Sequence, residues 1–319
     1  MADTLFINIF QLYFYIAIGF LIGFFFRNYR EKISKYCTWF LINIATPVVI
    51  FLTLTTTNYN IDFWLIFQIV IVEVLSVLVA MGTTYYYLLK KGEDKRKIGS
   101  FLFINGFPNA LIYTMPIVFA FFSEELVIIP VIFSSAALFV RGTLGMYVGE
   151  KLGADVQVSW KTTIKHLVTF PPLLGIIIGS LVLAFAIPMP VQLFSDIKTY
   201  MNPFYSNLGS ILIGIILSKL TKTDFKSYWK DIKLVALWRF AIMFLFFLSI
   251  AYLLQFPTDQ TDIRTILLID VIGPPAVINV AFALYFKLDD KFAAVSVAAV
   301  TLLALGILPL ILWFGSTCL

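Results

Sequence analysis

Four ionisable side chains lie within long apolar runs of this sequence. Glu73 stands in IFQIVIVEVLSV, and Arg141, Arg239 and Asp270 stand in three other apolar stretches. A charge placed that deep in a hydrocarbon layer costs about 3 kcal/mol on insertion scales, so such residues usually belong to a transport pathway or pair with a partner. These residue types are suited to binding a proton, an ion or a charged solute.

Each of the four has a functional and a structural interpretation. Glu73 is expected to couple a proton to transport or to sense substrate charge. The structural alternative is an ion pair or, if the acid is protonated, a hydrogen bond to a neighbouring helix. Arg141 could clamp a second substrate carboxylate in bidentate fashion, or snorkel, or pair with Glu73. For Arg239, snorkelling is the better interpretation. Asp270 could bind a proton or cation, or cap the half-helix that follows it.

Two apolar stretches carry helix-breaking residues near their middle. INGFPNALIYTMP contains Gly106 and Pro108, and DVIGPPAVINV contains Gly273, Pro274 and Pro275. Proline removes a backbone donor and clashes with the preceding turn, and glycine loosens the helix further. We therefore expect both helices to be unwound there. Where two such breaks cross, half-helix N-termini favour an anion, which predicts a substrate site built largely from bare peptide groups.

Three asparagines accompany these breaks. Asn105 and Asn109 flank the first, and Asn279 follows the second. Their amides are neutral donors to a carboxylate, suited to a substrate that must also leave. The alternative is that they join neighbouring helices or cap the broken ones. We expect substrate contacts from Asn109, Asn105 and Asn279, beside Pro108, Pro274 and Pro275.

The composition decides which elements must position these residues. Of 319 residues, 61% are hydrophobic and 13% charged, which is far more apolar than a soluble domain. The chain is therefore predicted to be an all-α integral membrane protein. One histidine and two distant cysteines offer no metal centre or disulfide framework, and no cofactor is expected. A net charge of +5, mixed with apolar runs, does not suggest nucleic acid.

Ten apolar stretches are long enough to span a bilayer of about 30 Å. The first five are Leu5–Phe26, Ile33–Thr56, Phe63–Leu89, Ile98–Phe121 and Glu125–Gly149. The second five are Ile164–Ile187, Tyr200–Leu220, Ile232–Leu254, Ile263–Phe286 and Phe292–Phe314. Spans 4 and 9 are the two that contain the breaks.

The basic residues predict the orientation of these spans. The odd-numbered loops hold 19 of the 23 Lys and Arg residues, so they face the cytoplasm and both termini face outward. Five spans per half then give two inverted repeats, 1–149 and 164–319, joined by a cytoplasmic linker at 150–163. Glu73 precedes Pro108 by 35 residues, and Arg239 precedes Pro274 by the same 35.

Several motifs resemble those of the auxin efflux carrier family, which includes plant PIN-type auxin exporters and bacterial malate and malonate carriers. FPNALIYTMPIVFAFF looks like the family's crossover motif in span 4. Weaker matches cover the family's spans 2, 6, 7 and 9, at Ala45–Leu54, Pro171–Leu181, Leu208–Leu220 and Gly273–Phe286. The resemblance implies elevator-type transport, with scaffold and transport domains each drawn from both repeats. It also implies a carboxylate site near Pro108 and Asn109, a protonatable acid at Glu73 and a homodimer in the cytoplasmic membrane.

Three classes of function remain to be compared. A carrier of small organic anions fits the paired breaks and the sparse buried charges, and Arg141 favours a dicarboxylate such as malate over an auxin-like monocarboxylate. A membrane enzyme would need a cluster of catalytic groups, which these scattered charges do not form. A channel or receptor would need pore-lining polar rings or larger outer loops. The sequence therefore predicts a secondary transporter, with possible proton coupling.

Overall fold

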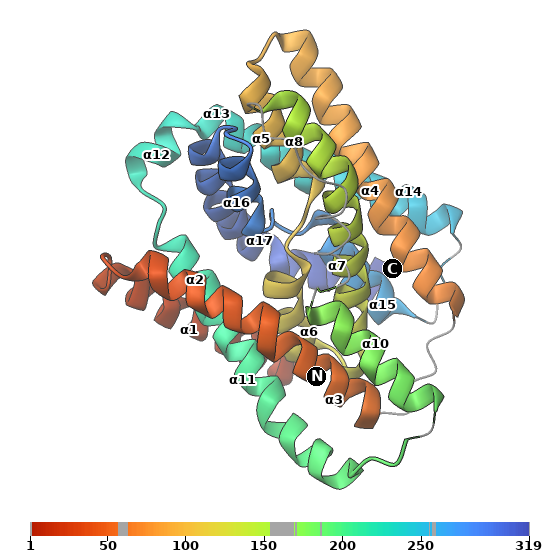
Figure 1. Cartoon of the computed structure of the whole chain (residues 1–319). Coiled ribbons are helices and arrows are strands. Elements are labelled where there is room, and N and C mark those ends of the chain that lie inside the picture. The colour runs from red at the N-terminus through yellow and green to blue at the C-terminus, as the bar shows by residue number, and fades with distance from the viewer. Residues whose placement is uncertain are drawn as a thin grey trace. The chain divides into compact units, whose positions relative to one another are not determined.

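The computed structural model describes residues 2–56, 63–153, 169, 171–185, 187–254, 256 and 260–318. Across these ranges every regular element is a helix, and the one β-type contact pairs Pro108 with Pro275. Figure 1 follows the helices in chain order. The all-helical class predicted from composition is correct.

Several helices are long and apolar enough to cross a membrane. Among the described residues there are five such helices, at Arg30–Thr56, Phe63–Lys91, Glu124–Leu152, Trp229–Leu253 and Asp290–Cys318. Shorter apolar helices occupy Phe10–Phe25, Ala110–Phe121 and Pro171–Leu183. These lengths and compositions are those of a multi-pass membrane protein.

Most expected spans coincide with helices, with one clear difference in a boundary. The span expected from Tyr200 begins earlier, because α11 (Val191–Leu217) starts directly after Pro190. Its first turns are too polar to be recognised as part of an apolar stretch. They are still compatible with a helix, because Gln192 donates to Asp196, one turn later, at 3.2 Å. Most of the expected linker 150–163 and the start of the sixth span lie outside the described residues.

Contacts divide the chain into two units, and each draws on both halves of the sequence. Unit 1 comprises Met1–Phe63, Leu111–Val131 and Val168–Lys219. Unit 2 comprises Trp64–Ala110, Ile132–Leu167 and Leu220–Leu319.

Unit 1 is organised around α11. Its other helices are α1 (Ala2–Phe25), α2 (Arg30–Phe40), α3 (Thr46–Thr56), α6 (Met115–Phe121) and α10 (Pro171–Ala184), and a π-helical turn at Leu41–Ala45 joins α2 to α3. Glycines let α1 and α11 approach closely: a Cβ on Gly19 would lie 1.9 Å from the Ile211 carbonyl oxygen, and one on Gly214 would lie 2.0 Å from that of Ile16. Backbones meet this closely in membrane helices only through small residues.

Unit 2 is organised around α17 (Asp290–Cys318), which packs against several other helices and whose buried residues include the small Ala298, Ala299 and Ala304. The helices around it are α5 (Lys95–Gly106), α12 (Lys222–Ser227), α13 (Trp229–Leu237), α15 (Thr261–Ile272) and α16 (Ile278–Tyr285). The rest of unit 2 contains α4 (Phe63–Lys91), α8 (Met146–Leu152), α14 (Met243–Leu253) and most of α7 (Ile128–Val140).

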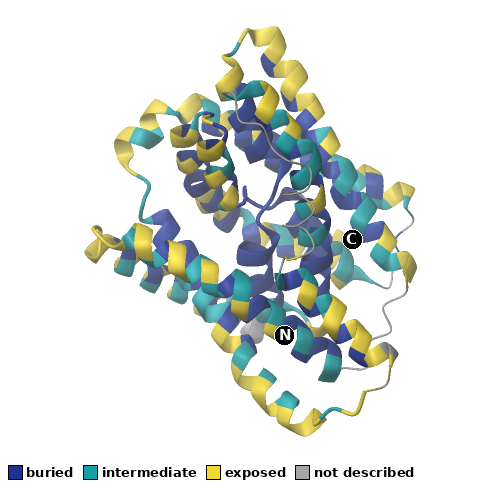
Figure 2. Ribbon diagram, in the orientation of Figure 1, coloured by how far each residue is buried: buried dark blue, intermediate teal, exposed yellow. Residues whose placement is uncertain are grey.

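Both predicted breaks are present. Span 4 stops being helical after Gly106 and resumes with a π-helical turn at Ala110–Thr114, and span 9 is interrupted between α15 and α16. Residues 98–110 and 265–276 are all buried, and buried residues are dark blue in Figure 2. The irregular backbone is thus packed inside protein, as it must be if lipid surrounds the molecule.

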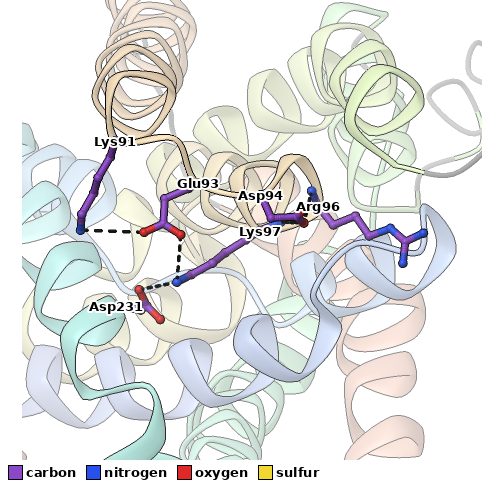
Figure 3. A network of polar contacts seen from close by, with 6 residues as sticks. All are labelled: Lys91, Glu93, Asp94, Arg96, Lys97 and Asp231. Carbon is purple, nitrogen blue, oxygen red and sulfur yellow. Dashed lines mark hydrogen bonds and ion pairs between the residues drawn. The ribbon is translucent and has the colours of Figure 1, made fainter.

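An ion-pair network fixes the start of α5 (Figure 3). Lys97 Nζ lies 3.0 Å from Asp231 Oδ1 on α13 and 3.3 Å from Glu93 Oε2. The Asp94 carboxylate caps the helix by accepting hydrogen bonds from the amides of Arg96 and Lys97. Burial opposes the charge on Lys97, but Asp231 and Glu93 outweigh it and raise the pKa of the Lys97 amine above its ordinary value.

Candidate functional site

The two breaks in unit 2 pair with each other. Pro108 and Pro275 form an antiparallel bridge, in which the Asn109 amide donates to the Pro274 carbonyl and the Ala276 amide donates to the Phe107 carbonyl, both at 2.9 Å. This corrects the expectation of bare peptide groups at the crossing. Each break supplies the donors and acceptors that the other lacks, which is what a buried backbone requires.

Two backbone N–H groups beside this pairing are not used by it. The N–H groups of Val277 and Ile278, which open α16, make no hydrogen bond to any other residue that the structure describes. They stand at a helix N-terminus, where the helix dipole favours a negative charge. This end of α16 thus has two backbone donors that the pairing of the breaks does not use.

Arg141 lies next to the first break. It sits in a π-helical turn, Arg141–Gly145, and is buried. Its guanidinium carbon lies 4.6 Å from the centre of the Phe107 ring and 5.9 Å from that of Phe282. Its Nε has no hydrogen-bond partner among the described residues. A buried guanidinium stacked on aromatic rings, with a donor unused, is well suited to bind a carboxylate.

Arg239 is also buried and lies in a π-helical turn, Trp238–Ile242. It does not snorkel, so that interpretation was wrong. Its guanidinium donates to three backbone carbonyls, at Gly273, Asn105 and Val271. Snorkelling assumes that water is the nearest acceptor, and here the broken helices provide acceptors much closer.

Glu73 is fully buried and interacts electrostatically with Arg239, Arg141 and Asp270. Its Oε2 accepts a hydrogen bond from Ser76 at 3.0 Å, while Oε1 has no hydrogen-bond partner in the described part of the chain. No described ion pair within 4.0 Å joins Glu73 to either arginine. Two acids and two bases thus share one buried region without direct contact between Glu73 and the bases.

The three asparagines divide into two kinds. Asn105 donates to Thr84 Oγ1 and Asn279 donates to the Phe107 carbonyl, both at 2.9 Å, so their amides hold helices together. Asn109 as a residue is 7% exposed, and its side chain makes no hydrogen bond to another residue that the structure describes. Of the three, Asn109 is the one whose amide is available to a ligand.

All nine residues predicted for the site belong to one unit. Unit 2 contains Glu73, Asn105, Pro108, Asn109, Arg141, Asp270, Pro274, Pro275 and Asn279. Sequence reasoning missed Phe107 and Phe282, which flank Arg141, and Thr84. Only Phe107 carried a signal, because the residue before a proline favours an extended conformation, as Phe107 has here. Within the described ranges, no group of three or more His, Cys, Asp or Glu side chains could hold a metal ion.

Comparison with known proteins supports a coarse assignment. No protein-family model matches the chain. The chain is similar to an uncharacterized transporter of Methanocaldococcus jannaschii, with 22% identity over 305 residues that cover 92% of this chain and 94% of that protein. The similarity extends over nearly the whole of both chains. Together with the apolar helices, it supports a multi-pass membrane protein with a transporter role.

Proposed function

We propose that this protein is a secondary transporter of small organic anions, and that it binds its substrate beside the paired breaks of unit 2. The observation that carries the proposal is Arg141, a buried guanidinium that stacks on Phe107 and has an unused donor. A buried cation without a hydrogen-bonded counter-charge is costly, and a substrate carboxylate would supply the missing partner.

A second group of donors favours a dicarboxylate over a monocarboxylate. The side-chain amide of Asn109 and the backbone N–H groups of Val277 and Ile278 are neutral donors beside the same crossing. They would hold one carboxylate while Arg141 holds the other. A malate-like or malonate-like acid fits this arrangement. The alternative is an auxin-like monocarboxylate, which would occupy either Arg141 or the neutral donors but not both.

The proposed transport mechanism follows from the resemblance and from the division of the chain. We propose ten spans in two inverted repeats, with outward termini in the cytoplasmic membrane, as in the auxin efflux carrier family. Unit 2, which holds the site residues, would be the transport domain of an elevator and unit 1 the scaffold. Glu73 and Asp270 are the proposed proton or ion sites, and a homodimer is the proposed assembly. A carrier of this kind performs no covalent chemistry.

A binding screen tests the proposal directly. Purified protein is heated with malate, malonate and an indole carboxylic acid, because a ligand at a hundred times its Kd stabilises the folded state by about 2.7 kcal/mol. We expect the largest shift in Tm with a dicarboxylate. An absence of any shift, together with no uptake of these acids into proteoliposomes, would overturn the assignment of substrate class.

Arg141→Gln then tests the site, with Arg27→Gln as its matched control. Arg27 also stacks on an aromatic ring, at 4.8 Å from Phe24, but it is exposed and lies in unit 1. We expect Arg141→Gln to weaken dicarboxylate binding about 10- to 100-fold, as loss of a charged hydrogen bond does, and Arg27→Gln to bind normally. Equal affinities in the two variants would place the substrate elsewhere.

A further inference from the structure

Arg239 connects the two broken helices through backbone atoms alone. Nε donates to the Gly273 carbonyl at 2.8 Å, Nη1 to the Asn105 carbonyl at 2.8 Å, and Nη2 to the Val271 carbonyl at 2.7 Å. Asn105 lies in the last turn of α5, and the other two acceptors lie at the end of α15. Arg239 as a whole is 1% exposed.

Each of these three carbonyls has lost its usual hydrogen-bond donor within the helix, because of the breaks. In a continuous helix each would accept from the amide four residues later. For Asn105 that amide is Asn109, which donates to Pro274 instead. For Val271 it is Pro275, which has no N–H.

Gly273 is the third case. Its helical donor would be the Val277 amide, which makes no such bond among the described residues. A buried carbonyl without a donor costs about 1–3 kcal/mol, so three of them together would oppose the broken conformation strongly. One guanidinium satisfies all three.

The charge of Arg239 matters as much as its donors. A helix C-terminus carries about half a negative charge, so the ends of α5 and α15 together place about one negative charge at the crossing. The guanidinium cancels it. Without that cation, the crossing would repel an anion held by Arg141 or by the start of α16.

The helix that carries Arg239 is itself fixed to its neighbours. Asp231 on α13 pairs with Lys97 at the start of α5, at 3.0 Å. Trp238 Nε1 donates to Thr83 Oγ1 on α4, also at 3.0 Å. These two contacts fix the segment that precedes Arg239 against α5 and α4.

We propose that Arg239 is the positioning residue of this site. It holds the ends of α5 and α15 in the register in which Pro108 faces Pro275, and it cancels their negative charge so that an anion can bind nearby. The second part rests on the proposed function, whereas the first does not. A lysine keeps the charge but presents a single ammonium, which cannot replace a planar fork that spans two helices.

Amide hydrogen exchange tests the first part without any ligand. The readout is exchange at Asn109 and Ala276, whose amides form the pairing between the breaks. We expect Arg239→Gln to exchange about ten-fold faster than the wild type at both amides, with a smaller increase in Arg239→Lys. Arg27→Gln is the control, because it removes a guanidinium that also stacks on an aromatic ring but belongs to unit 1, whereas both breaks belong to unit 2. It should exchange at the wild-type rate.

Binding of malate to the same variants tests the second part. Neither variant can make the three hydrogen bonds of the guanidinium, but Arg239→Lys keeps the positive charge. If the charge favours anion binding, Arg239→Lys should bind malate more tightly than Arg239→Gln. Wild-type exchange at both amides in Arg239→Lys overturns the positioning role, and this holds even if Arg239→Gln does not fold. A wild type that binds no organic acid defeats the proposed function and leaves the exchange result to decide the role of Arg239.

Discussion

Pro108 and Pro275, which are far apart in the sequence, lie opposite each other as an antiparallel pair between two interrupted helices. Each proline denies its own helix a donor, and the residues next to it donate across to the other break. The groups paired in this way are already hydrogen-bonded, so a substrate would bind the amide and carbonyl groups that the pairing does not use.

Asn109→Ala should lower affinity for the transported anion about ten-fold, because it removes a neutral donor that no described residue uses. The measurement is uptake into proteoliposomes alongside Tm. Asn105→Ala serves as the comparison: its amide donates to Thr84, so we expect a lower Tm with affinity retained. The reverse pattern would exchange the roles of the two residues.

Asn279→Ala should destabilise the protein by about 0.5–1.5 kcal/mol, because the Phe107 carbonyl loses the side-chain donor and keeps only the Ala276 amide. Thermal unfolding in detergent measures the loss. Ser249→Ala is a suitable control, since its hydroxyl bonds only within its own helix. A Tm for Asn279→Ala equal to that of Ser249→Ala would show that the side-chain bond contributes nothing.

Glu73→Gln should abolish any dependence of transport on a pH gradient while leaving counterflow exchange of labelled for unlabelled substrate. The amide keeps the shape and can still accept from Ser76, but it cannot take up and release a proton. The experiment compares gradient-driven uptake with counterflow in one proteoliposome preparation. Gradient-driven uptake at the wild-type level would exclude Glu73 as the proton site.

Lys97→Met should reduce stability by about 0.5–1 kcal/mol near neutral pH, a modest value because solvent screens this network. The pKa of Lys97 is raised by Asp231 and Glu93, so its contribution is complete below the ordinary lysine pKa and is lost as pH rises through the folded value. The gap in Tm between wild type and variant should therefore close in alkaline solution. A gap that widens there would contradict the sign of the shift.

Gly19→Ala should disrupt the packing of α1 on α11, since the added Cβ would meet the Ile211 carbonyl at 1.9 Å and backbone cannot yield easily. Gly82→Ala is the matched control, because a Cβ there meets nothing within 4 Å. We expect a loss of at least about 2 kcal/mol for the first variant and none for the second. Equal Tm values would mean that the two helices are not in such close contact.

The sequence was sufficient to predict the helical class and the two breaks, because proline and glycine act locally and Pro108, Pro274 and Pro275 stand in apolar runs. It could not separate Asn105 from Asn109, since both are asparagines beside one break and only the path of the backbone turns one amide toward Thr84. The role of Arg239 was hidden for a similar reason. Its acceptors lie on two other helices, and the position of Arg239 along its own span does not predict which carbonyls are close to it.

The π-helical turns that hold Arg141 and Arg239 have an evolutionary consequence. Such a turn contains one residue more than an α-turn, so it behaves as a single-residue insertion within a helix. Deleting one residue there would let the helix close regularly and would rotate the following side chains by about 100° relative to the preceding ones. Relatives with regular helices at these points should therefore align to this chain only with one-residue gaps in mid-helix, beside the arginines.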